Sequence, residues 1–309
     1  MSPRASHFEA RAFGKVILLG EHAVVYGRPA IAAALPRGVA AVAEGGDGRG
    51  PRLSVPAWGV EVAPGDEGEL ARAFGAVLTA LGAQGADVRV TLTPEIPAGA
   101  GLGCSAALGV ASARAIAGAL GKALPVDEAI AVSLEWERVI HGNPSGIDNT
   151  LAAAGGVGLF RRGEPFVPIA LARPMTIAVG DTGLPGSTRE MVAAVARQRE
   201  RKPEAVDTVL DGIATIVQSG VHALQAADRV LLGRLFDLDQ ALLSSLLVST
   251  SELEDLCALA RAAGAHGAKL TGGGGGGCCI AIGDRPDEIV AAWRDAGFAG
   301  FVATIGGAS

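Results

Sequence analysis

Six consecutive glycines occupy residues 272–277, between two short apolar segments at 268–270 and 278–282 that read as strands. Flexible glycine-rich linkers usually join domains, whereas this run lies between two apolar strands. Glycine adopts positive φ without steric cost and lets a backbone lie close to a ligand. We therefore predict a tight functional turn here rather than a linker. A dinucleotide-type G-x-G-x-x-G pattern can be placed on Gly272, Gly274 and Gly277, but any run of six glycines satisfies it.

A second segment bounded by glycines, residues 14–27, reads G-K-V-I-L-L-G-E-H-A-V-V-Y-G. Its apolar strand is bounded by Lys15 on one side and by Glu21 and His22 on the other. Charged groups beside a buried strand need water or polar partners. Two interpretations remain open: a strand with charged ends, or a pocket rim that carries all three side chains.

The third segment, residues 97–107, reads P-A-G-A-G-L-G-C-S-A-A and leads into a helix of small residues. Free N–H groups and the helix dipole at such a helix start attract a phosphate. Ser105 adds a hydroxyl that can reach phosphate or Mg²⁺. The alternative is a helix packed tightly against a neighbour through Ala and Gly. The chain has no G-x-x-x-x-G-K-[ST] phosphate loop.

Charge and hydropathy exclude several classes of protein. With 26 basic and 32 acidic residues, a net charge of −6 argues against nucleic-acid binding but allows a nucleotide ligand. No apolar run approaches about 18 residues, so we expect no membrane-spanning helix. The polar residues 1–9 lack a secretory core. Without a C-x-x-C pair, the cysteines favour a reduced, cytoplasmic setting. They are Cys104, Cys257, Cys278 and Cys279.

Strands and helices are mixed along the chain, which indicates an α+β fold with two lobes. We place the domain boundary near residues 171–174, giving domains 1–172 and 173–309. Asp127 is expected to cap the helix 127–141, and Asn143 to cap a further helix that begins at Pro144. Strands are expected at 8–13, 15–19, 31–43, 52–55, 59–62, 88–92, 155–160, 166–169, 175–180, 268–270, 278–282 and 301–305. Helices are expected at 69–81, 105–120, 127–141 and 287–296, with three or four more within 187–263.

The densest polar stretch is residues 135–149. Glu137 and His141 are four residues apart and share a helix face. Asp148 lies in the first turns of the next helix. Two carboxylates from two helices suit one Mg²⁺ ligand and one base. The alternative is a solvated helix end with a structural histidine.

Taken together and in this order, these segments resemble the GHMP small-molecule kinases, which include galactokinases, homoserine kinases, mevalonate kinases and phosphomevalonate kinases. Within that superfamily, the string I-H-G-N-P-S-G-I-D-N at 140–149 is most similar to the mevalonate kinase family. Residues 182–188 also resemble that family's segment ending in a Ser-Thr pair. The resemblance implies a two-lobed GHMP kinase fold. Its N-terminal domain is like ribosomal protein S5 and its C-terminal domain is a ferredoxin-like α/β domain.

The resemblance also implies an activity: ATP-dependent phosphorylation of the C5 hydroxyl of mevalonate, with Mg²⁺. Asp148 falls at the catalytic aspartate, and Lys15 at the lysine that contacts the hydroxyl and the γ-phosphate. Ser105 and Glu137 fall at the Mg²⁺ ligands. The positions on the substrate side are Glu21, His22, Thr188, Gly272 and Gly273. The nucleotide positions are Pro97, Gly99, Ala100, Gly101, Leu102, Gly103, Cys104, Ser105 and Ala106.

This chain departs from the family pattern at three positions. Cys104 replaces the first Ser of a Ser-Ser pair, Leu108 stands where animal relatives often have Tyr, and Gly273 replaces an Ala. The competing hypotheses are a related kinase acting on phosphomevalonate or another alcohol, a nucleotide-binding oxidoreductase, and a non-catalytic binding module. An early strand–GxGxxG–helix is absent, which argues against the oxidoreductase. The expected partners are mevalonate and ATP, and a homodimer is one assembly that the resemblance allows.

Overall fold

The computed structural model describes residues 7–142 and 144–307. Contacts divide the chain into two compact units, and the chain passes from one to the other several times. The predicted boundary between residues 172 and 173 stays a prediction. The first unit consists of Met1–Gly14, Arg37–Pro97 and Gly103–Gly155, and the second of Lys15–Pro36, Ala98–Leu102 and Gly156–Ser309.

A sheet of mixed strand directions builds the first unit. β4 pairs with β3, β3 runs parallel to β5, and β5 runs antiparallel to β2, which also pairs with β1. Val90 lies opposite both Leu53 and Ala43, and all three side chains are fully buried. Alternate residues of these strands therefore form one apolar face. The strands are β1 (Phe8–Leu19), β2 (Ala30–Gly45), β3 (Arg52–Val55), β4 (Val60–Val62) and β5 (Val88–Pro94).

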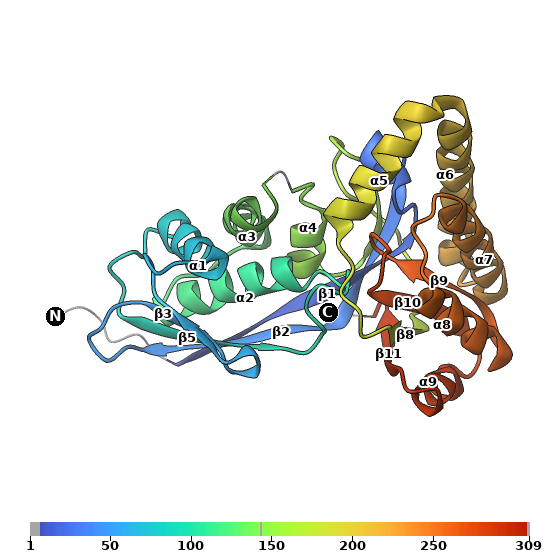
Figure 1. The fold of residues 1–309 in the computed structure, drawn as a ribbon. Coiled ribbons are helices and arrows are strands. Elements are labelled where there is room, and N and C mark those ends of the chain that lie inside the picture. Colours follow the sequence, from blue (N-terminus) through green and yellow to red (C-terminus); the bar gives the residue numbers. More distant parts are fainter. Residues whose placement is uncertain (1–6, 143, 308–309) are drawn as a thin grey trace. The chain divides into compact units, whose positions relative to one another are not determined.

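Four helices lie together on one side of this sheet (Figure 1). α2 packs on β5 and on the other three helices. Its small residues allow this close packing, because a Cβ added to Gly109 would lie only 3.0 Å from Cγ of Trp136. The helices are α1 (Glu69–Ala80), α2 (Cys104–Ala119), α3 (Val126–His141) and α4 (Ile147–Ala154).

The starts of α3 and α4 differ from the sequence expectation. Pro125 is the N-cap of α3, so Asp127 lies in the first turn instead of capping the helix. α4 begins at Ile147 and not at Pro144. The residue before it, Gly146, has a left-handed backbone with a φ of 83°. A left-handed glycine reverses the chain, which places the helix start three residues later. Asn143 lies outside the described residues.

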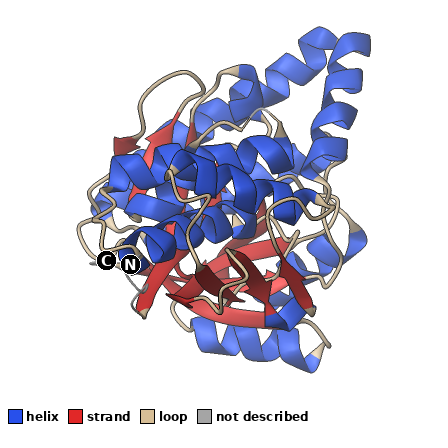
Figure 2. Ribbon diagram, turned by 90° about the vertical axis from the view of Figure 1, so that its left-hand side faces the viewer, coloured by secondary structure: helices blue, strands red, loops and turns tan. Residues whose placement is uncertain are grey.

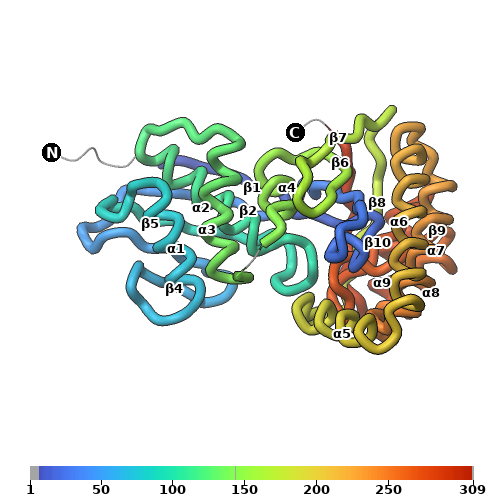
Figure 3. Tube along the Cα trace, turned by 90° about the horizontal axis from the view of Figure 1, so that it is seen from above, coloured from blue at the N-terminus to red at the C-terminus, as the bar shows by residue number. Residues whose placement is uncertain are grey.

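The second unit contains a four-stranded antiparallel sheet in the order β11-β8-β10-β9. Helices connect β8 to β9 and β10 to β11, so the sheet is ferredoxin-like, as expected. α6 and α7 lie side by side in the first connection (Figure 3). The strands are β8 (Met175–Asp181), β9 (Ala265–Thr271), β10 (Cys278–Gly283) and β11 (Ala299–Ile305). The helices are α5 (Thr188–Arg201), α6 (Pro203–Ala226), α7 (Arg229–Ser245), α8 (Ser251–Ala262) and α9 (Pro286–Asp295).

The same unit holds residues 30–36 of β2. Residues 30–33 pair with β6 (Val157–Phe160), and β6 pairs with β7 (Val167–Pro168). A short 3₁₀ helix, η1 (Ala23–Tyr26), follows β1. Figure 2 distinguishes the helices in blue from the strands in red and shows the strands backed by helices. The two sheets confirm the α+β class. In the part of the chain that the structure describes, no helix is long and apolar enough to cross a membrane.

Two glycines allow α7 to lie directly on β9. A Cβ at Gly267 would sit 1.8 Å from the carbonyl oxygen of Gly233, which is backbone and cannot move aside. Gly267→Ala should therefore lower the free energy of unfolding by about 3 kcal/mol, the upper end of typical overpacking costs. Urea denaturation measures this loss. The control is Gly85→Ala, where an added Cβ meets nothing within 4 Å; equal midpoints for the two variants would contradict the prediction.

Candidate active site

The six-glycine run forms a tight turn between β9 and β10, as predicted. All of its glycines except Gly273 have positive φ. At Gly274 a Cβ would lie 2.1 Å from the carbonyl oxygen of Val248, so only glycine fits. The amide of Gly277 donates to the carbonyl of Leu184 (2.8 Å), and a Cβ at Gly101 would lie 3.3 Å from the carbonyl oxygen of Thr271. The turn therefore packs on residues 98–102 and 184–186 within the second unit.

Residues 97–103 form a loop before α2, in which left-handed glycines alternate with other residues. Gly99, Gly101 and Gly103 have φ of 70°, 79° and 74°. Where left-handed residues alternate with right-handed helical ones, successive backbone N–H groups turn toward a common side, an arrangement that can bind an anion. Gly103 is the N-cap of α2, whose first turn also has free N–H groups. Of the other predicted nucleotide positions, Ala100, Leu102, Cys104 and Ala106 are buried, and Pro97 and Ser105 are half-buried.

Lys15 lies in β1 and is only 7% exposed. Its amide donates to the carbonyl of Leu102 (2.9 Å), which places the strand beside the glycine loop 98–102. Two residues later, the amide of Ile17 donates to Oγ1 of Thr271, and that hydroxyl donates back to the carbonyl of Ile17. The predicted lysine and the start of the six-glycine turn are therefore joined through hydrogen bonds in one unit.

Glu21 and His22 are both buried, at 1% and 4% exposure. His22 has a left-handed backbone (φ 60°), which is uncommon for a residue with a Cβ. Burial lowers the pKa of its ring, so the ring is neutral, and Nε2 donates to the carbonyl of Gly273 (2.8 Å). Donation from Nε2 leaves Nδ1 as an acceptor. Among the described residues, Nδ1 has no hydrogen-bond partner.

Thr188 is the first residue of α5, after the N-cap Ser187, whose hydroxyl accepts from the amide of Glu190 (3.3 Å). It packs directly on Gly273. A Cβ added to Gly273 would lie 2.8 Å from Cα of Thr188 and 2.9 Å from its hydroxyl oxygen. A side chain at residue 273 would therefore require the threonine to move away from the turn.

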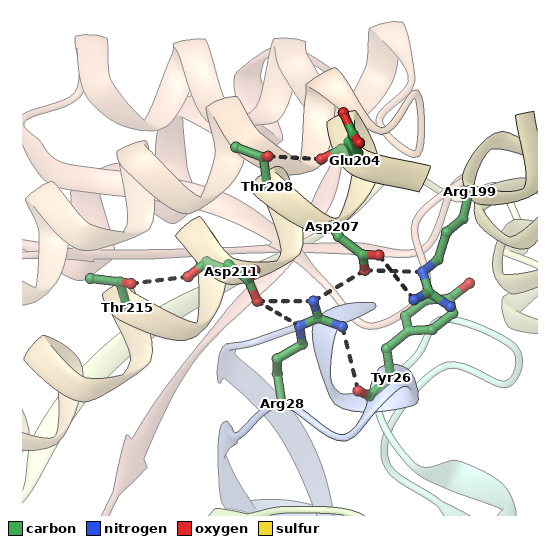
Figure 4. A network of polar contacts seen from close by, with 8 residues as sticks. All are labelled: Tyr26, Arg28, Arg199, Glu204, Asp207, Thr208, Asp211 and Thr215. Carbon is green, nitrogen blue, oxygen red and sulfur yellow. Dashed lines mark hydrogen bonds and ion pairs between the residues drawn. The ribbon is translucent and has the colours of Figure 1, made fainter. Parts of the chain in front are cut away.

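A network of ion pairs holds the segment after His22 (Figure 4). Arg28 on this segment contacts Asp207 (3.1 Å) and Asp211 (2.9 Å) on α6. Arg199, near the end of α5, donates to both oxygens of Asp207 and lies 5.0 Å over the ring of Tyr26. Hydrogen bonds from Arg199 hold the pKa of Asp207 below its usual value. The helix that begins at Thr188 is therefore attached to η1 at its other end.

In the first unit, the Ser105 hydroxyl donates to Oε1 of Glu137. Glu137 is 3% exposed, and its Oε2 lies 3.7 Å from Nε2 of His141 on the next turn of α3. Asp148 lies half-buried in the first turn of α4, where the helix dipole favours a negative charge. The predicted Mg²⁺ ligands Ser105 and Glu137 are thus adjacent. The described residues contain no group of three or more His, Cys, Asp or Glu side chains suited to a metal.

Sequence reasoning assigned no role to several polar residues around these positions. Asn149 donates from α4 to the hydroxyl of Ser133 on α3 (2.8 Å), which fixes the helix that carries Asp148. Lys269 forms an ion pair with Glu21, and Asp239 lies beside both. Lys269 directly precedes the Leu-Thr before the glycine run, but nothing in the sequence indicated that it is buried. All four cysteines are buried free thiols.

Cys104, at the start of α2, is a buried thiol whose pKa burial raises to about 11. In the unfolded chain the thiol ionises near pH 9, so rising pH favours the unfolded state through this group. Its contribution to stability is intact below pH 9 and is lost between pH 9 and pH 11. Over that window the wild-type protein should lose about 2–3 kcal/mol more unfolding free energy than Cys104→Ala. Denaturant unfolding at each pH measures the difference, and parallel curves would refute it.

Two family models match separate parts of the chain. Residues 69–156 match the family described as GHMP kinases N terminal domain, and residues 221–299 match GHMP kinases C terminal. Two curated relatives are mevalonate kinases. That of Thermococcus gammatolerans is 36% identical over 93% of each chain, and that of Aeropyrum pernix is 39% identical over 88% of this chain and 87% of its own.

A solved structure of an L. major mevalonate kinase, in complex with R-mevalonate, is 31% identical and aligns over 99% of this chain and 98% of its own, with a TM-score of 0.87. A Methanococcus jannaschii mevalonate kinase is 25% identical and aligns over 98% and 99%, with a TM-score of 0.83. The fold and the matched segments define a small-molecule kinase of the GHMP type. The chain belongs to the mevalonate kinase family.

Proposed function

We propose that this protein transfers the γ-phosphoryl group of ATP to the C5 hydroxyl of (R)-mevalonate and forms 5-phosphomevalonate. One observation carries the proposal: the chain aligns along almost its whole length with a mevalonate kinase solved in complex with R-mevalonate. Phosphoryl transfer depends mainly on positioning and on neutralising charge. The residues described above offer both.

The nucleotide phosphates are assigned to the glycine loop 97–103 together with residues 104–106 of α2. Its left-handed glycines and the first turn of α2 present N–H groups, which bind anions without any strongly basic side chain. Cys104 supports this assignment, because its thiol stays protonated at neutral pH and adds no negative charge beside the phosphates. The small residues of the loop let the phosphates approach the backbone closely.

Mg²⁺ is assigned to Ser105 and Glu137, and it would neutralise charge on the β- and γ-phosphates. The donor set fits this ion, because Mg²⁺ in kinases typically takes one or two protein oxygens and fills its other positions with phosphates and water. A buried carboxylate that accepts a hydrogen bond from a serine hydroxyl offers two oxygen ligands at one place.

Asp148 is assigned the hydroxyl proton, and Lys15 the developing negative charge. A carboxylate in the first turn of α4 can accept a proton from the attacking alcohol. The ammonium group of Lys15 would favour the alkoxide character of the nucleophile and offset charge on the transferred group. The C5 oxygen forms a bond to the γ-phosphorus while the bond from that phosphorus to the β,γ-bridging oxygen breaks, so ADP leaves and the hydroxyl proton passes to Asp148.

Mevalonate is assigned to the surface formed by His22, Thr188, Gly272 and Gly273. The hydroxyl of Thr188 offers a donor beside Gly273, and the buried ring of His22 fixes the carbonyl of Gly273 through Nε2. Glu21 is assigned to the same region, but its side chain is fully buried against Lys269. Its part in substrate binding is therefore indirect.

The test is a coupled assay for ADP release with ATP, Mg²⁺ and (R)-mevalonate, with ³¹P NMR of the product. The expected product is a phosphomonoester on C5. Phosphomevalonate, galactose and homoserine form the substrate panel, and turnover of one of these in place of mevalonate would overturn the proposal. We also propose a homodimer and a cytoplasmic location; light scattering on the purified chain tests the first, and cell fractionation the second.

A further inference from the structure

Three ionisable side chains lie completely buried together in the second unit: Glu21 after β1, Asp239 on α7 and Lys269 on β9. We call them the buried triad. All three side chains have 0% exposure. Lys269 donates to Oε1 of Glu21, and its Nζ lies 3.5 Å from Oδ2 of Asp239. Buried charges of this kind persist only when each is compensated.

Two carboxylates face a single ammonium group. The triad therefore has a net charge of about −1 unless one carboxylate is protonated. Oε2 of Glu21 and both carboxylate oxygens of Asp239 have no hydrogen-bond donor among the described residues. Asp239 also lies within side-chain hydrogen-bonding range of Glu21, and burial raises its pKa well above the usual value. One proton on Asp239, donated to Glu21, gives the unpaired oxygen of Glu21 a donor and makes the triad neutral.

The triad is connected to both sides of the candidate mevalonate surface. Glu21 directly precedes His22, whose left-handed backbone persists only where its surroundings fix it. Lys269 lies four residues before Gly273, the residue whose carbonyl accepts from the His22 ring. Lys269 also donates to the carbonyl of Leu270 (2.6 Å), so its ammonium group holds the strand as well as Glu21.

α7 reinforces the same strand. Gln240, next to Asp239, accepts from the amide of Leu270 (2.8 Å). Its amide group donates to Glu254 (2.9 Å) and Ser249 (3.0 Å), which fixes its orientation. Asp239 and Gln240 are neighbours on α7, and both contact residues of β9. Asp239 also links α7, through the triad, to Glu21, the residue before His22.

We propose that Lys269 and Asp239 are positioning residues for the alcohol substrate. Lys269, and a proton shared between Glu21 and Asp239, fix Glu21 so that His22 keeps its left-handed backbone and its Nε2 stays on the carbonyl of Gly273, beside Thr188. Neither residue touches the substrate. The inference rests on the proposed function for its kinetic test, but its structural test is independent.

The first experiment compares Lys269→Met with Asp239→Asn. Methionine keeps the length of the lysine stem and removes the cation, so the KM for mevalonate should rise at least tenfold while the KM for ATP changes less than twofold. Asparagine keeps a neutral side chain with an N–H donor for Glu21, so Asp239→Asn should stay within threefold of wild type in both constants. Lys122→Met, at an exposed lysine of the first unit, is the matched control.

The second experiment reads His22 directly. Long-range ¹H–¹⁵N NMR of the imidazole should show the Nε2-protonated tautomer in the wild type and in Asp239→Asn, and a changed ring signal in Lys269→Met. If Lys269→Met does not fold, Glu21→Gln/Lys269→Met removes the unpaired charge, and this variant should fold with the raised KM for mevalonate and the changed ring signal.

Two outcomes would overturn the inference: a folded lysine variant with an unchanged KM and ring signal, or an Asp239→Asn variant as impaired as the lysine variant. A wild-type protein that does not phosphorylate mevalonate would overturn the proposed function instead. The NMR comparison would still test the triad in that case.

Discussion

Asp148→Asn is expected to lower kcat about a thousandfold, within the usual range for removal of a general base. Asparagine preserves the size of the side chain and its first-turn position on α4, but it cannot accept the hydroxyl proton. The substitution does not alter the glycine loop before α2, so the dissociation constant of a non-hydrolysable ATP analogue should stay within threefold of the wild-type value. Steady-state kinetics and calorimetric titration measure the two quantities.

The control is Asp127→Asn, which removes an exposed carboxylate from the first turn of α3. It should leave kcat within twofold. If Asp148→Asn turns over nearly as fast as the wild type, Asp148 does not receive the proton, and the mechanism proposed for this residue is wrong.

The second large effect is expected at Glu137. Glu137→Gln keeps an oxygen that can accept from the Ser105 hydroxyl but removes the charge that Mg²⁺ requires. We expect the Mg²⁺ concentration for half-maximal activity to rise at least tenfold, and kcat at saturating Mg²⁺ to fall about a hundredfold. Activity measured across a Mg²⁺ titration at fixed ATP checks both.

Glu135→Gln is the matched control, because Glu135 is two residues away on the same helix and pairs with Arg138 at the surface. Its Mg²⁺ titration should superimpose on that of the wild type. Identical titrations for the two variants would remove Glu137 from the Mg²⁺ site and leave its contacts with Ser105 and His141 as structural.

Local sequence patterns predicted the backbone features of the site. The six-glycine turn and the glycine loop before α2 concern short segments, and their glycine content determines them directly. The proximity of Ser105 to Glu137 was implied by the family resemblance and not by a local pattern. The i,i+4 spacing of Glu137 and His141 placed them on one face, and their atoms lie 3.7 Å apart.

The long-range polar contacts could not be predicted in this way. Glu21 and Lys269 are 248 positions apart, and only the antiparallel sheet of the second unit and the path of β1 bring them together. The start of α4 was also mispredicted, because a left-handed Gly146 outweighed the local preference of Pro144 for the first helical position. The Glu21–Lys269 contact and the start of α4 both depend on tertiary contacts, which a local sequence pattern does not contain.

The interleaving of the chain has a consequence for any attempt to cut it into halves. Residues Lys15–Pro36 belong to the same unit as the ferredoxin-like sheet. The side chain of Leu19 packs directly on Gly220 of α6. A Cβ added to Gly220 would lie only 2.3 Å from Cδ1 of Leu19. A fragment beginning at residue 173 would lack the side chain of Leu19 and would also lack Glu21, one of the two carboxylates beside Lys269. During synthesis, the C-terminal half must therefore dock onto a strand that left the ribosome long before it.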